Sequence, residues 1–105
     1  MPQFDVYRNP NTATQTAFPF ILDIQHEQLS DLGTRIVLPL GRLQYFKNEN
    51  LGKLTPVIKY EGDELLLLTP QVASMPTNRL RNPVGTLEHF RTEILAALDF
   101  AITGI

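Results

Sequence analysis

The chain contains no cysteine among its 105 residues. Disulfide bonds, zinc–thiolate sites and thiol catalysis are therefore excluded. An excess of positive charge is missing too, because nine Lys and Arg stand against eleven Asp and Glu, which gives a net charge of −2. Nonspecific binding to nucleic acid needs an excess of positive charge that attracts the phosphate groups. The charge balance of this chain therefore argues against a DNA- or RNA-binding protein.

Long apolar segments are also absent from the sequence. No apolar run approaches the roughly 20 residues that a helix needs to cross a bilayer, so we expect no membrane partner. The first residues lack the basic stretch followed by an apolar stretch that marks a signal peptide. Together with the lack of cysteine, this predicts a cytoplasmic protein.

What the chain does contain is enough apolar material for a core. Hydrophobic residues make up 43% of the sequence and charged residues 19%, which is a globular composition rather than a disordered one. The length is close to the commonest domain size. We therefore expect one domain over residues 1–105.

Short apolar runs separated by turn-forming residues predict a series of strands. They cover Gln3–Tyr7, Ala17–Gln25, Thr34–Leu40, Thr55–Tyr60, Glu64–Thr69 and Val72–Met75. A hairpin is expected at Glu61-Gly62-Asp63, where a short loop contains glycine. The run Leu65–Leu68 is apolar on both faces of its strand. It must be covered by the helix and sheet or by another subunit, and this favours a dimer.

One helix is predicted after the strands. From Leu87 onward, large apolar residues recur every three or four positions, as one face of a helix requires: Leu87, Phe90, Ile94, Leu98 and Ile102. Thr86 is a suitable N-cap, and Gly104 is a suitable helix stop because glycine readily takes the left-handed conformation. Strands followed by a helix predict an α+β, mainly β fold, or a small barrel-like β fold with one helix.

The closing segment from Asp99 to Ile105 is the most informative part of the chain. It passes from a helical pattern into a glycine and a large apolar residue. The segment either packs into the core or is displayed as a contact surface, and the apolar pattern alone favours the core. Asp99 opposes the helix dipole near the C-terminal end. A residue that works against local stability points to a function, such as pairing with a basic residue of a partner.

No set of residues carries a catalytic signature. His26 and His89 lack the spacing of a metal site and are interpreted as surface histidines. Neither Ser30 nor Ser74 lies in a Gly-x-Ser-x-Gly elbow, and the glycines are dispersed as turn elements. We therefore expect no cofactor, no metal and no enzymatic activity. A metal-free ribonuclease that acts through a groove stays open as an alternative.

Short motifs in order over almost the whole length resemble the CcdB toxin family. They are Gln3-Phe4-Asp5-Val6-Tyr7, Asp23-Ile24-Gln25, Arg35-Ile36-Val37-Leu38-Pro39-Leu40, Pro56-Val57-Ile58, Ala73-Ser74-Met75-Pro76 and Gly104-Ile105. The chain is closer to the divergent chromosomal members than to the plasmid-borne prototype. The resemblance implies a CcdB/MazF-like small barrel: a twisted antiparallel sheet, a small wing sheet and one C-terminal helix, assembled as a homodimer.

The resemblance also implies a function without chemistry. Toxins of this type II toxin–antitoxin system bind the GyrA subunit of DNA gyrase and trap the cleaved-DNA complex. A CcdA-like antitoxin neutralises the toxin, and the two together repress their operon, so operator DNA is met only indirectly through the antitoxin complex. Such systems serve plasmid maintenance and transcription autoregulation.

The family's gyrase-binding surface maps onto six positions of this chain. They are Gln28, Leu29, Asp99, Thr103, Gly104 and Ile105. The prototype has tryptophan where this chain has Thr103, asparagine at Asp99 and isoleucine at Gln28. The missing tryptophan removes the residue type most enriched in binding hot spots. Two alternatives therefore stay open, a MazF-like endoribonuclease and a homologue that has lost gyrase poisoning.

Overall fold

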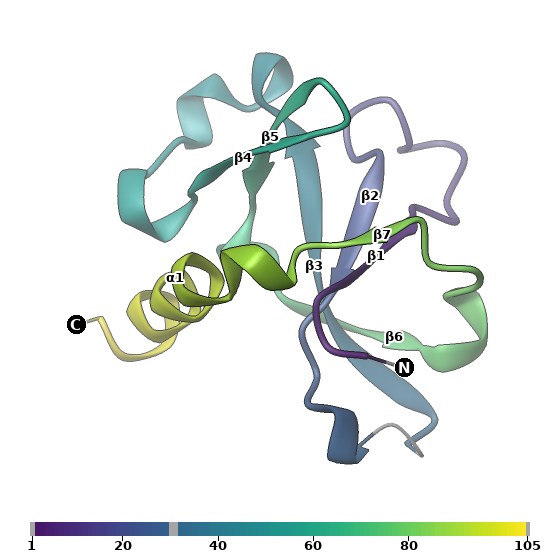
Figure 1. The fold of residues 1–105 in the computed structure, drawn as a ribbon. Helices are drawn as coiled ribbons and strands as arrows, with labels where there is room; N and C mark the ends of the chain where they lie inside the picture. The colour runs from purple at the N-terminus through teal and green to yellow at the C-terminus, as the bar shows by residue number, and fades with distance from the viewer. Residues whose placement is uncertain (1, 30–31, 105) are drawn as a thin grey trace.

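The computed structural model of the chain describes residues 2–29 and 32–104. Within these residues, seven strands precede one α-helix (Figure 1). They are β1 (Asp5–Arg8), β2 (Phe20–Asp23), β3 (Thr34–Arg42), β4 (Val57–Tyr60), β5 (Asp63–Leu67), β6 (Ala73–Pro76) and β7 (Gly85–Thr86), followed by α1 (Arg91–Thr103). Short 3-10 turns connect several of these elements, among them η1 (Glu27–Leu29), η4 (Gly52–Leu54) and η7 (Glu88–Phe90).

The strands form one antiparallel sheet in the order β4-β5-β3-β2-β1-β7, and β6 pairs with β3 beside this path. β3 is nine residues long and divides its outer edge between two partners. Its first half, Thr34–Val37, pairs with β6, and its last residues, Leu40–Arg42, pair with β5. The sheet therefore splits at β3 into two arms (Figure 1).

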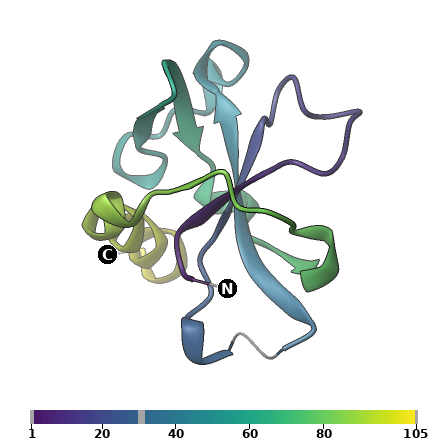
Figure 2. The same ribbon diagram turned by 45° about the vertical axis from the view of Figure 1, so that its right-hand side comes forward.

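The sheet curls until its two end strands approach each other (Figure 2). Gly85 of β7 lies against the ring of Tyr60 of β4, and a Cβ atom on Gly85 would stand 2.1 Å from the Tyr60 hydroxyl oxygen. Only glycine permits this close approach. The missing side chain at Gly85 therefore makes room for the Tyr60 hydroxyl where the two ends of the sheet meet.

The main core lies between the sheet and α1. Alternation along β2 places Phe20 and Leu22 in this core, where Ile94 and Ala97 of α1 meet them,. The opposite face of the sheet carries a second buried cluster of Tyr7, Ile21, Val37 and Leu80, with Met75 packed against it. β2 is consequently buried on both faces.

The predicted strand at Leu65–Leu68 is buried within this one chain. Exposure of its four leucines is 0% to 2%. The chain itself supplies the cover on both faces, so this run gives no argument for a dimer.

A mainly β fold with a curled antiparallel sheet and one C-terminal helix confirms the predicted fold class. The hairpin β4–β5 forms at Glu61-Gly62 as expected and joins the sheet through β3. The sequence did not reveal β7, a two-residue strand that pairs with β1. It also placed the start of the α-helix too early. Leu87 has φ −112° and ψ 25°, outside the helical region, and a 3-10 turn over Glu88–Phe90 precedes the α-helix.

A fully buried ion pair ties β2 to β3. Arg35 donates from Nε and Nη2 to the two carboxylate oxygens of Asp23, at 2.9 and 3.0 Å, and both side chains have zero exposure. Gln25 completes the arrangement, since its N–H donates to Asp23 Oδ1 at 3.0 Å and its carbonyl accepts from Arg35 Nη2 at 3.1 Å. Multiple hydrogen bonds to both charges are what such burial requires.

Asp5 is a second buried carboxylate, and it predicts a pH effect. Burial raises the pKa of Asp5, and the neighbouring Asp23 carboxylate raises this pKa further. The folded protein therefore binds the Asp5 proton more tightly than the unfolded chain does. Ionisation of Asp5 must then lower the free energy of unfolding as the pH rises above the ordinary carboxyl pKa. We expect Asp5→Asn to raise the melting temperature at pH 7 and to change it little near pH 3.

Thermal unfolding followed by circular dichroism between these pH values measures the effect. The matched control is Glu64→Gln, since Glu64 is an exposed carboxylate on β5. An Asp5→Asn variant whose melting temperature differs from wild type equally at both pH values would contradict the expected linkage.

Candidate functional site

Helix α1 is fixed to the body of the protein through its first half. Ile94 and Ala97 are fully buried against the sheet, and Leu87 anchors the turn that precedes the helix. The prediction of Thr86 as the N-cap of the α-helix is wrong, because Phe90 is the residue that precedes α1. The Thr86 hydroxyl instead accepts the N–H of Glu88 at 3.1 Å, ahead of the 3-10 turn. The 3-10 turn η7 follows, and the α-helix begins at Arg91. The helix is thus a rigid arm with one anchored end.

The other end of α1 has a defined geometry. Gly104 adopts the left-handed conformation, with φ 74° and ψ 16°, and its N–H donates to Phe100 O at 2.9 Å. This is the predicted glycine stop. Thr103 donates its hydroxyl to Asp99 O at 2.6 Å, so its side chain is turned back along the helix. The cap therefore ends the helix at a defined residue.

The last turn of α1 is exposed rather than packed. Ile102 is 77% exposed and Phe100 is 42% exposed. The assignment of Ile102 to the buried helical stripe is therefore wrong. The stripe reaches Leu98. The last turn of the helix lies at the left of the view, below the 3-10 turns that precede β4 (Figure 1). We call Asp99, Phe100, Ile102, Thr103 and Gly104 the helix-end surface.

The helix-end surface combines exposed apolar area with one negative charge. No basic residue lies in the last turn, and the exposed Asp99 has no ion pair within the described part of the chain. Phe100 also borders a cavity of about 370 Å³ between α1 and η4, together with Lys53, Pro56, Glu93 and Ala96. Exposed large apolar side chains at the end of a helix are typical of an interaction site.

Gln28 and Leu29 lie in η1, which connects β2 to β3. This turn is held by local hydrogen bonds: Gln28 donates its N–H to His26 Nδ1 at 3.1 Å, and Gln25 Nε2 donates to Leu29 O at 2.8 Å. Both Gln28 and Leu29 are exposed. Figure 1 shows η1 at the bottom of the view and the end of α1 at its left edge, so the two groups lie apart within one chain.

Of the six residues that the sequence offered for this surface, the structure brings three together at the end of α1. They are Asp99, Thr103 and Gly104. Ile105 lies outside the described residues. Sequence reasoning missed Ile102 as an exposed residue, although a signal was present, because the helix stop at Gly104 follows it by only two positions.

The described residues provide little for catalysis. Residues 2–29 and 32–104 contain no cluster of His, Asp or Glu that could hold a metal ion. The two histidines are exposed, as predicted; His89 packs its ring against Phe90, with ring centroids 4.4 Å apart. Over the same ranges, no helix combines the length and the hydropathy of a membrane span.

Comparison with protein families settles the family of the chain. The family model described as CcdB protein matches residues 3–104. The chain belongs to the CcdB family. The match extends from β1 to the cap of α1, so it includes the sheet, η1 and the helix-end surface. Membership in this family makes the chain a toxin of the toxin–antitoxin type.

Proposed function

We propose that this CcdB-family protein is a cytoplasmic homodimer that binds the GyrA subunit of DNA gyrase and traps the cleaved-DNA complex. It acts by binding, without an active site of its own. The observation that carries the proposal is the helix-end surface, where Ile102 is 77% exposed on a helix that Ile94 and Ala97 anchor in the core. We assign the gyrase contact to this surface, to Ile105 and to Gln28 and Leu29.

The rigidity of the arm supports this assignment. α1 is anchored by Ile94 and Ala97, and its end is fixed by the Gly104 cap, so little conformational entropy is lost when a partner binds there,. Thr103 stands where the prototype has tryptophan, but its hydroxyl is occupied by Asp99 O. Phe100 and Ile102 are then the large apolar groups available for a hot spot,. Asp99 adds a negative charge suited to a basic residue of GyrA.

A second exposed apolar area supports the homodimer. Ile36 on β3 shares a sheet face with the core residues Leu38 and Leu40, but α1 does not cover it, and it is 44% exposed,. Val72, next to β6, is 42% exposed, and β6 pairs with this part of β3. Two copies that meet across this face would bury both residues. A dimer would also allow η1 of one copy to share a partner with α1 of the other.

Neutralisation by a CcdA-like antitoxin is the second part of the proposal. The chain carries a net charge of −2, so its composition offers no excess of positive charge for binding DNA,. Repression of the operon is therefore assigned to the antitoxin complex, in which this protein meets operator DNA only indirectly.

Removal of residues 103–105 tests the gyrase contact. The buried anchors Ile94 and Ala97 stay in place, so the truncated protein is expected to fold. We expect it to lose growth inhibition and to bind a purified GyrA fragment at least about tenfold more weakly by calorimetry, as removal of hot-spot contacts does. Thr92→Ala, an exposed change near the start of α1, is the matched control and is expected to bind normally.

Three results would count against the proposal. A folded truncated protein that still inhibits growth and binds GyrA fully would place the contact elsewhere. RNA cleavage by the purified protein without gyrase would favour a MazF-like endoribonuclease. A full-length protein that neither binds GyrA nor stabilises gyrase–DNA cleavage would identify a homologue that has lost gyrase poisoning.

A further inference from the structure

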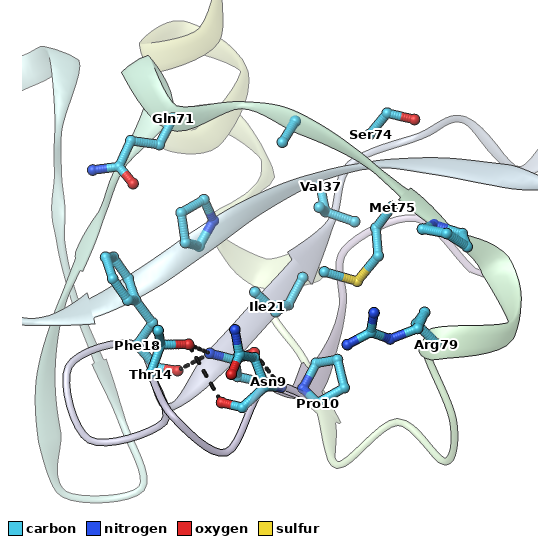
Figure 3. Close-up of a pocket in the computed structure, with 14 residues that line it drawn as sticks. Asn9, Pro10, Thr14, Phe18, Ile21, Val37, Gln71, Ser74, Met75 and Arg79 are labelled. Carbon is cyan, nitrogen blue, oxygen red and sulfur yellow. Dashed lines mark hydrogen bonds between the residues drawn. The ribbon is translucent and has the colours of Figure 1, made fainter.

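A pocket lies on the face of the sheet opposite α1. It has a volume of about 460 Å³, within the range of small-molecule sites,. Figure 3 shows the fourteen residues that line it. β2 and β3 form the floor, the connection between β1 and β2 forms one wall, and β6 with the turn after it forms the other.

The floor of the pocket is apolar and continuous with the second buried cluster. Ile21 and Val37 are only 6% and 2% exposed, and Met75 packs against them from β6. Pro39 extends this floor along β3. Methionine is unbranched and polarizable, so it adapts to the shape of an apolar group that enters.

The wall formed by the β1–β2 connection is held in place by hydrogen bonds within the protein, so it is pre-formed. The Asn9 side chain donates from Nδ2 to Thr14 Oγ1 and to Phe18 O, both at 2.9 Å. The same side chain accepts the N–H of Asn11 at Oδ1, also at 2.9 Å. These bonds lock a polar loop around a buried asparagine. Pre-formed walls are typical of ligand sites, because ordering them costs nothing on binding.

Arg79 supplies the charge of the pocket. It is the one charged residue among the fourteen that line it. Figure 3 shows its guanidinium group reaching toward the pocket beside Met75. Within residues 2–29 and 32–104, Arg79 takes part in neither of the two ion pairs. A guanidinium beside an apolar floor matches a carboxylate joined to an apolar body.

We propose that this pocket binds a small organic carboxylate with an aromatic or branched aliphatic body. The apolar body lies on Ile21, Val37 and Met75, and the carboxylate pairs with Arg79. None of these residues belongs to the helix-end surface. The pocket is therefore a second binding site, independent of the proposed gyrase contact.

Titration of the intact protein with phenylacetate tests the proposal. Nuclear magnetic resonance follows the Met75 methyl group and the backbone amides of Asn11 and Ser74. We expect saturable shifts at these positions. The neutral analogue 2-phenylethanol, which keeps the ring and lacks the carboxylate, is expected to bind about tenfold more weakly, as the loss of a charge-assisted hydrogen bond predicts.

Two variants and one control assign the effect to the pocket. Arg79→Gln is expected to weaken phenylacetate binding about tenfold and to remove the preference for the carboxylate over the alcohol. Ala73→Phe, which places a ring over the floor from β6 opposite Val37, is expected to abolish binding. Arg81→Gln lies outside the pocket and is expected to bind as wild type does.

The proposal is overturned if folded wild-type protein shows no saturable shift with phenylacetate. It is equally overturned if Arg79→Gln binds as wild type does, or if the ring at position 73 leaves binding intact. GyrA binding is measured separately on the same variants and is expected to be unchanged. Failure of either proposal therefore leaves the other one testable.

Discussion

Replacing Arg35 by methionine is expected to lower the free energy of unfolding by about 3–5 kcal/mol, because it leaves the Asp23 carboxylate buried without its partner. Both side chains of this pair are fully buried. After the change, the Asp23 carboxylate retains the Gln25 N–H as its remaining partner from the network that ties β2 to β3. A single missing cation would then outweigh any gain from the added apolar side chain.

Urea denaturation of wild type, Arg35→Met and the double variant Asp23→Leu with Arg35→Met measures this effect. The double variant has no uncompensated charge, so it is expected to recover most of the lost stability. Burial raises the pKa of Asp23, and without Arg35 its proton is held still more tightly. The defect of Arg35→Met should therefore shrink as the pH falls. A defect of the same size in the double variant would mean that packing, not charge, controls this site.

The second large effect separates two isoleucines on the same helix. Ile94 is fully buried and Ile102 is 77% exposed. Ile94→Ala is expected to cost about 2–5 kcal/mol of unfolding free energy, since it opens a cavity under α1. Ile102→Ala is expected to change stability by less than about 0.5 kcal/mol. It should nevertheless weaken GyrA binding, because Ile102 is the most exposed large apolar residue of the helix-end surface.

The two variants are matched in chemistry and differ in position, so each controls for the other. Denaturant unfolding and calorimetry with the GyrA fragment are measured on both. If Ile102→Ala binds GyrA as wild type does while staying folded, the helix-end surface is not the contact. If it unfolds as readily as Ile94→Ala, the end of the helix packs on the body of the protein in solution.

The sequence predicted what depends on local patterns. Alternating apolar residues located most of the strands, and the glycine at position 104 located the helix stop, because both signals arise from neighbouring residues. The exposure of Ile102 was not predictable in this way. The spacing of apolar residues predicts which of them share one face of a helix. It does not predict how many of them the sheet covers.

Contacts between distant segments explain the other differences. β7 is only two residues long, and it forms because it pairs with the edge of β1, a strand near the other end of the sequence. The buried Asp23 carried a partial signal, since a carboxylate inside an apolar strand needs a partner. Nothing in the sequence alone names Arg35 as that partner. The pocket at Arg79 assembles from segments far apart in the chain, so it too required the fold.

The pairing of β1 with β7 delays completion of the fold during synthesis. Asp5 and Val6 pair with Thr86 and Gly85, and Phe4 O accepts the N–H of Leu87. The arm that carries the helix-end surface can therefore dock only after almost the whole chain has left the ribosome. An incomplete chain is therefore unable to hold the helix-end surface in its native position until translation is nearly finished.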